Sequence, residues 1–242
     1  MSTTLLSVIE WVRPYVGNLY MLLDGTLEPA VSNANLILST ILSPPFCWEW
    51  NRNTTTFNCV TAENQVDYEE EISDFGFLEA ADITVPTGAP TDANTIYQLQ
   101  LEKKLQRSSQ PGRPGQIMVF LDDQDGNITF RLGTTCPDLA YTVTLTYQKA
   151  IQPFTKLNVN IPIPDKLMHI FRYGFLALAF LYDQDPRFTE MNQKFIAALL
   201  GAQQGLDETQ RNIFLGNWYQ LIADEQAAIV KVQQGHQARG IM

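Results

Sequence analysis

The chain has 242 residues, of which 45% are hydrophobic, and a net charge of −10 from 26 acidic and 16 basic residues. This length accommodates one large domain or two small ones, and the hydrophobic fraction is enough for an ordinary folded core. The acidic excess disfavours a general nucleic-acid-binding protein, which needs basic side chains to release counterions from phosphates. A wall that DNA merely slides past is compatible with the charge, because an acidic surface repels phosphate.

Three cysteines, Cys47, Cys59 and Cys136, show no paired CxxC spacing. We interpret them as small buried residues in a reducing compartment rather than as a disulfide framework or a zinc site. The first residues, 1–4, predict no signal peptide. The most hydrophobic run, 171–182, contains an arginine and is shorter than the ~20 residues that cross a bilayer. It therefore predicts a buried helix and no contact with a membrane.

Helical periodicity marks both ends of the chain. Residues 4–22 are predicted to form a helical region that is interrupted near Pro14 and Gly17, and a clearer helix is expected to follow Pro29 until prolines 44–45 stop it. Three more helices are predicted near the C-terminus, each with a capping aspartate at its start. They are expected to begin at Asp165, Asp185 and Asp207. The first should end near Leu181, the second at Gly201 or Gly205, and the third near Gly235.

Between these halves, alternating short runs separated by turn residues predict seven strands. The expected strands are 54–60, 65–71, 77–85, 95–102, 116–121, 127–132 and 141–148. Strands of this length and spacing are typical of an antiparallel sandwich or a barrel-like domain. We therefore predict an α+β protein: a discontinuous helical bundle, residues 1–45 with 164–242, interrupted by an antiparallel β domain, residues 46–163.

An aromatic segment, 46–51, connects the second helix to the first strand. Its alternation predicts an extended strand in which Trp48 and Trp50 point the same way and pack over helix ends. The alternative is that the two indole rings stack on a ligand.

Candidate chemistry is sparse. The segment 122–127 is a hairpin turn by its Asp-Gly pair, and a calcium loop is the alternative, although the later glutamate of an EF-hand is missing. Histidines occur at 169 and 236, neither beside a nucleophile in a known motif, and no glycine-rich phosphate loop is present. We therefore predict no catalytic residues, no metal and no cofactor. We interpret one acidic run as a solvent-exposed face or as a sheet edge whose charges prevent misassociation, with acid–base catalysis as the alternative. This run consists of Asp67, Glu69, Glu70, Glu71 and Asp74.

The long basic connection 103–115 joins two predicted strands. Loops of this length without secondary structure are usually functional or disordered. A second connection, 87–94, is neutral and built of short side chains.

The order of these features resembles the head-to-tail adaptor (neck or connector) proteins of tailed bacteriophages. The resemblance rests on the helix 28–38, the aromatic segment 46–51, the β insertion, and the step Ile163–Pro164 into a terminal helical block. The layout is similar to the tail tubular protein A type of short-tailed phages. Segments similar to virion proteins encoded among phage structural genes are 171–179, 185–188 and 204–209.

The resemblance implies a structural virion protein, made in the host cytoplasm, that forms a ring, typically a dodecamer, below the portal. Its helices would build a collar against the portal, its β domain would reach the downstream tail or nozzle protein, and DNA would pass through the lumen without sequence-specific binding. The C-terminal segment would dock into the portal through Gln233, Gln234, His236, Gln237, Arg239, Ile241 and Met242. This polar segment is predicted to be disordered alone and to order on binding; a frayed end without a role is the alternative.

Two charged surfaces complete the expectation. The loop residues Lys103, Lys104, Arg107 and Arg113 would contact an acidic neighbouring ring or the DNA, and Asp67, Glu69, Glu70 and Glu71 would form an acidic surface or channel wall. Other hypotheses are a nozzle or stopper that binds the adaptor instead of the portal, and a carbohydrate-binding β module that uses Trp48, Trp50 and Tyr97.

Overall fold

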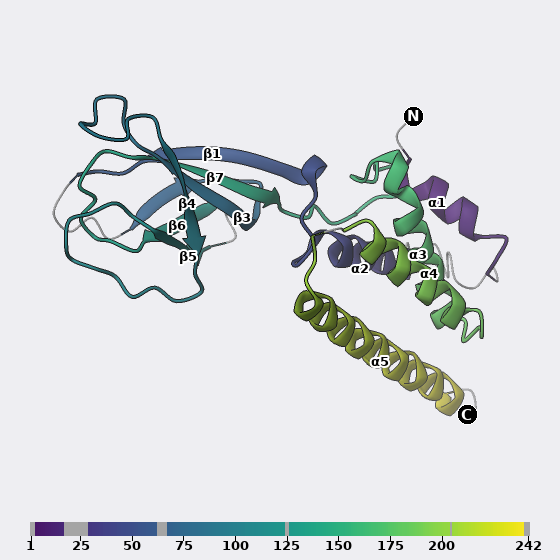
Figure 1. Cartoon of the computed structure of the whole chain (residues 1–242). Coiled ribbons are helices and arrows are strands. Elements are labelled where there is room, and N and C mark those ends of the chain that lie inside the picture. Colours follow the sequence, from purple (N-terminus) through teal and green to yellow (C-terminus); the bar gives the residue numbers. More distant parts are fainter. Residues whose placement is uncertain (1–2, 17–28, 62–66, 124–125, 204, 240–242) are drawn as a thin grey trace. The chain divides into compact units, whose positions relative to one another are not determined.

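The computed structural model describes residues 3–16, 29–61, 67–123, 126–203 and 205–239, with backbone only for 230–239. The chain divides into two compact units. Met1–Phe46 and Ile151–Met242 form a helical unit, and Cys47–Ala150 form a β unit (Figure 1). The predicted α+β class, with helices flanking a barrel-like domain, is confirmed.

Five α-helices and one short 3₁₀ turn make up the described part of the helical unit. They are α1 (Leu5–Val12), α2 (Ala30–Leu42), η4 (Asp165–Leu167), α3 (Met168–Tyr182), α4 (Phe188–Gly201) and α5 (Glu208–Arg239). Thr4 begins α1, because its side-chain oxygen accepts a hydrogen bond from the Ser7 N–H at 3.2 Å. Asp207 and Gln210 begin α5 with a reciprocal pair of side-chain-to-backbone bonds of 2.7 and 3.1 Å.

The central helix of this unit is α3, which is buried on nearly every side from Gly174 to Leu181. Gly174 permits this packing: a Cβ there would lie 2.8 Å from Ile37 Cδ1 of α2 and 2.9 Å from the Phe195 ring of α4. A helix that is hydrophobic all round needs cover on all sides, which the flanking helices supply.

A segment outside the helices and strands, 154–161, ties the two ends of the chain together. The Leu5 N–H donates to the Val159 carbonyl at 3.1 Å, and the Asn35 side chain exchanges two hydrogen bonds with the Phe154 backbone. The N-terminal helices are therefore held by residues that follow the β unit in sequence.

The β unit is a seven-stranded sheet that is nearly closed into a barrel. Its strands are β1 (Arg52–Asn58), β2 (Tyr68–Glu71), β3 (Phe75–Thr84), β4 (Ile96–Leu101), β5 (Gln116–Asp122), β6 (Asn127–Leu132) and β7 (Thr142–Lys149), in the order β1-β7-β3-β4-β5-β6-β2. Phe57 of β1 and Tyr68 of β2 stack at 4.9 Å across the gap between the end strands. The antiparallel prediction is wrong for one pair, because β4 and β5 run parallel.

The core of the barrel follows the predicted alternation. Along β7, Val143, Leu145 and Tyr147 are buried while the threonines between them are half-buried. The side-chain period of two therefore places one face of each strand inside.

Three local predictions are corrected. The aromatic segment is not a strand: Glu49–Asn51 form a 3₁₀ turn, η3. Helix α4 begins at Phe188 rather than Pro186, because the Asp185 carboxylate accepts the Arg187 N–H at 2.8 Å and closes a turn first. Helix α5 continues through Gly235 to Arg239, so the segment predicted to be disordered is helical over its described residues. A glycine costs a helix only about 1 kcal/mol, which good helix formers around it can offset.

Candidate functional site

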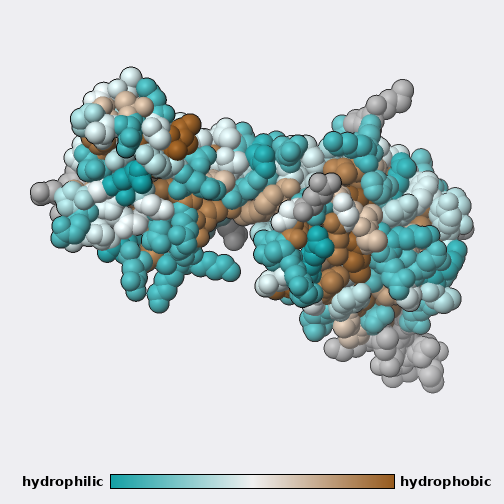
Figure 2. All heavy atoms as spheres, viewed as in Figure 1, coloured by the Kyte–Doolittle hydropathy of each residue, from teal (hydrophilic) through white to brown (hydrophobic). Residues whose placement is uncertain are grey.

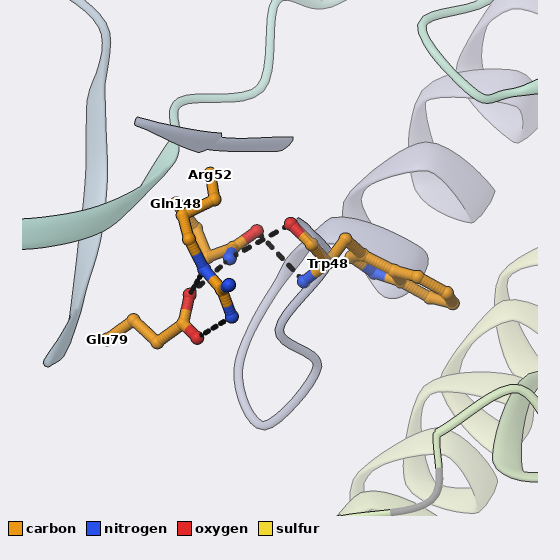
Figure 3. A network of polar contacts seen from close by, with 4 residues as sticks. All are labelled: Trp48, Arg52, Glu79 and Gln148. Atoms are coloured by element: carbon orange, nitrogen blue, oxygen red, sulfur yellow. Dashed lines mark hydrogen bonds and ion pairs between the residues drawn. The ribbon is translucent and has the colours of Figure 1, made fainter. Parts of the chain in front are cut away.

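A polar network around the buried side chain of Gln148 holds together the start and the end of the β unit. Arg52, at the beginning of β1, pairs in register with Gln148 near the end of β7. The side-chain amide of Gln148 accepts a hydrogen bond from the Trp48 N–H at 3.1 Å and donates to the Trp48 carbonyl at 3.2 Å. Gln148 thus supplies the backbone of Trp48 with the pair of bonds that a neighbouring strand would provide (Figure 3).

The carboxylate of Glu79 completes this network from β3. It accepts a hydrogen bond from the Gln148 amide at 2.6 Å and forms a two-point ion pair with Arg52 (Figure 3). Burial alone would raise the pKa of Glu79, but the bonds from Arg52 and Gln148 outweigh burial and lower it. Glu79 therefore stays ionised near neutral pH and is unsuited to act as a general base there.

Polar bonds also surround this network. The Asn51 side chain donates to the Lys149 carbonyl at 3.2 Å, and the Tyr147 hydroxyl donates to Asp74 at 2.6 Å. Burial, followed by the Glu79 charge, raises the pKa of the Cys47 thiol to about 11. A thiol with so high a pKa is a poor nucleophile at neutral pH.

The four residues predicted as an acidic surface do not share one environment. Asp67 is half-buried and accepts hydrogen bonds from the Arg131 guanidinium at 2.6 and 3.1 Å, with Arg107 at 3.7 Å. Glu69 and Glu71 are exposed, whereas Glu70 is half-buried, and burial raises its pKa. Glu69 and Glu71 are the two that remain available for a charged surface.

Backbone hydrogen bonds fix the basic loop, residues 103–115, to the barrel. The Ser108 N–H donates to the Gly133 carbonyl at 2.9 Å, and the Gly112 N–H donates to the Cys136 carbonyl at 3.1 Å. The Arg107 guanidinium lies 3.7 Å from the Asp67 carboxylate, and partial burial lowers the pKa of Arg107.

The remaining three basic residues of the loop differ in their surroundings. Arg113 lies over the Tyr97 ring at 3.6 Å, which is the geometry of a cation–π contact. Lys103 and Lys104 are exposed. Of the four predicted loop residues, the two lysines are thus the ones best placed for a partner.

The predicted portal-docking residues follow the part of α5 that packs on its own unit. Phe214, Trp218 and Ile222 are buried at four-residue intervals, and the Trp218 indole N–H donates to the Asn192 side chain at 2.8 Å. Residues 233, 234, 236, 237 and 239 lie on the helical backbone beyond them, while Ile241 and Met242 lie outside the described residues.

Hydrophobic residues also reach the surface of the helical unit. A hollow of about 400 Å³ lies between the α3–α4 turn and α5, lined among others by Phe180, Phe188 and Ile229. Ile213 and Tyr219 of α5 are 57% and 53% exposed. Figure 2 shows brown, hydrophobic residues among hydrophilic ones on the visible face of this unit.

Two alternative ligand sites are not favoured by the geometry. Trp48 is only 4% exposed, and its ring lies 5.8 Å from that of Trp50 at a tilt of 38°, so the two rings form no open stacking platform. In the predicted turn, Asp123 accepts the backbone and side-chain N–H groups of Asn127, as expected for a hairpin between β5 and β6.

The described residues were also considered as metal ligands and as membrane-spanning helices, and they form neither. Among the residues that the structure describes, no group of three or more His, Cys, Asp or Glu side chains is placed to hold a metal ion. Within those same residues, no helix has the length and hydrophobicity to cross a membrane.

Sequence reasoning missed the Gln148 network. In the alternation of β7, Gln148 occupies a position that reads as solvated, yet it is fully buried. Its hydrogen-bond partners are Trp48 and Glu79, which are far away in sequence, so the hydrophobic periodicity of β7 could not predict them.

A family model described as SU10 adaptor protein matches residues 3–216, nearly the whole chain. The match agrees with the predicted resemblance to head-to-tail adaptors, while the tail tubular protein A type stays a prediction. Among curated proteins, none matches the chain.

Proposed function

Because the chain belongs to the SU10 adaptor protein family, we propose that it forms a ring that joins the portal of a phage capsid to the tail and surrounds the DNA channel. The family match over residues 3–216 is the observation that carries this proposal. The two units support it, since separate helical and β units can contact two different partners.

The proposed assignment of partners follows the two units. The helical unit would contact the portal, and the β unit would contact the downstream tail or nozzle protein. The ring would be a dodecamer by analogy with the resemblance, and DNA would pass without sequence-specific binding. No catalytic role is proposed.

The test of this function is reconstitution with the portal. Purified chain is mixed with the portal of the same phage, and the complex is examined by native mass spectrometry and electron microscopy. We expect a ring of the chain bound to one face of the portal. A chain that stays monomeric and ignores the portal at micromolar concentration would refute the proposal, and binding to another adaptor instead would favour the nozzle or stopper.

The C-terminal part of α5 is the proposed docking element. Deleting 233–242 should leave the fold intact, because it keeps Phe214, Trp218 and Ile222, the buried residues among the described side chains of α5. The truncated chain should bind the portal more weakly than the full chain. Its circular dichroism spectrum should lose only the helical signal of the deleted residues, and unchanged attachment would rule out the docking role.

The charged surfaces are assigned further proposed roles. Lys103 and Lys104 would contact an acidic neighbouring ring or the DNA, and Glu69 and Glu71 would face the channel. Charge reversal of both lysines should weaken binding to the tail protein in a salt-dependent manner. The matched control is the charge reversal of Lys194, which is paired with Glu190 on α4 of the helical unit.

A further inference from the structure

The outer edge of β1 lies at the gap between the two end strands of the β unit. This end strand pairs along its whole length with β7 and has no second strand partner in the described sheet. The Thr54 N–H bonds the Asn53 side chain at 3.0 Å, so it points away from β7, and alternation turns the backbone of Thr56 the same way. Residues 53–58 carry no charge and no proline, which are the usual devices that prevent edge pairing.

A second unpaired edge lies where β5 extends beyond the end of β4. The two strands are in register only at Gln100–Gln116 and Leu101–Ile117, and the Glu102 N–H bonds the Ile117 carbonyl at 2.9 Å. By alternation, Val119 directs its backbone groups to the same side, beyond the end of β4. Phe120 and Leu121, which follow, are 45% and 55% exposed.

Charge distinguishes these two edges from the remaining one. Residues 47–150 contain 15 acidic and 7 basic side chains, a net charge of −8. Two such units repel each other, so copies should meet where acidic side chains are missing. The segments 53–58 and 117–121 contain none, and the exposed Lys103 and Lys104 follow β4, whereas β2 carries Glu69, Glu70 and Glu71.

We propose that neighbouring copies of the chain associate by strand addition, with the outer half of β5 in one copy pairing with the open edge of β1 in the next. This inference rests on the proposed ring. Two different edges make a head-to-tail contact, which is the kind that can close into a ring. The threonines of β1 would face Phe120 and Leu121, since β-branched and aromatic side chains form favourable cross-strand pairs.

The test uses charges placed on the two edges of the full chain. Thr56→Glu and Leu121→Glu each put a carboxylate on an exposed position, and Thr91→Glu adds the same charge to an exposed loop as a control. Each single edge variant should weaken association about 100-fold or more, because a charge in a pairing edge must be desolvated. Native mass spectrometry should then show monomers for these variants and rings for the control.

A double variant tests the pairing itself. Thr56→Lys combined with Leu121→Glu should restore the ring, since every contact then joins a lysine to a glutamate. Thermal unfolding checks that each variant folds. Rings that persist in both single glutamate variants, or a double variant that stays monomeric, would overturn the β5–β1 pairing while leaving the proposed function intact. If the wild-type chain forms no ring even with the portal, the proposed function fails and the pairing fails with it.

Discussion

Replacing Gln148 with leucine tests whether the buried network holds the β unit together. Leucine has a similar size but cannot accept the Trp48 N–H or donate to Glu79. The Trp48 carbonyl keeps a bond from the Asn51 N–H at 3.0 Å, so the loss falls on the Trp48 N–H and on the carboxylate.

The expected loss of stability follows from these two groups. A buried N–H that loses its acceptor costs about 1–3 kcal/mol, and a hydrogen bond to a charged group contributes about 1.5–3 kcal/mol. The leucine gains some hydrophobic burial in return. We therefore expect the free energy of unfolding of the β unit to fall by about 2–4 kcal/mol.

Two measurements on the full chain check this expectation. Urea unfolding gives the change in stability, and hydrogen exchange reports the protection of the Trp48 amide, which should drop in the Gln148→Leu variant. Gln98→Leu is the matched control, because Gln98 is an exposed glutamine of β4 and should change stability by less than about 0.5 kcal/mol.

A Gln148→Glu variant separates charge from shape. At neutral pH it places a second carboxylate beside Glu79, so it should be at least as destabilising as leucine, and protonation should relieve the repulsion in acid. The reasoning would be refuted if Gln148→Leu unfolded at the wild-type urea midpoint with an equally protected Trp48 amide.

Further predictions concern packing, pH and an ion pair. Gly174→Ala should destabilise the helical unit by about 1–2 kcal/mol, because the new Cβ would lie 2.9 Å from the Phe195 ring. Gly216→Ala should stabilise α5 by up to about 1 kcal/mol, because a Cβ there has no atom within 4 Å and alanine favours a helix more than glycine does. Thermal unfolding of the two variants should therefore shift in opposite directions. The ionised Glu79 stabilises the fold fully above its unfolded pKa of about 4.3, and this stabilisation is lost as the pH falls through its lower folded pKa. When unfolding is measured at decreasing pH, the Glu79→Gln variant should therefore lose less stability than the wild type. Asp67→Asn should lower the urea midpoint of unfolding, since it removes the carboxylate charge that the Arg107 and Arg131 guanidinium groups share.

Most secondary structure could be predicted from local pattern. All seven strands lie within a few residues of the predicted ranges, because alternation and turn residues act over short distances. The strand predicted for the aromatic segment 46–51 was wrong because a long-range contact decides its structure. The Gln148 side chain binds the Trp48 backbone, and a 3₁₀ turn follows Trp48. A contact between residues 100 positions apart cannot be predicted from the pattern of neighbouring residues in the sequence.

The candidate site residues show the same limit. Composition identified a basic loop and an acidic strand, but it could not show that Arg107 and Asp67 form an ion pair with each other. Charged residues of opposite sign in separate segments look equally available in a sequence. The fold divides them into those that bond within the barrel and those that face solvent.

This division also bears on how the chain meets DNA. Of the seven basic side chains in the β unit, Arg52, Arg107 and Arg131 are paired with carboxylates, and Arg113 lies on the Tyr97 ring. Tight binding to DNA requires cations that replace the counterions of several phosphates, and affinity falls steeply with salt when few are available. A unit of charge −8 with its arginines engaged internally should therefore repel the duplex. DNA should show no retardation by the chain at physiological salt, which is the behaviour expected of a channel wall that lets DNA pass.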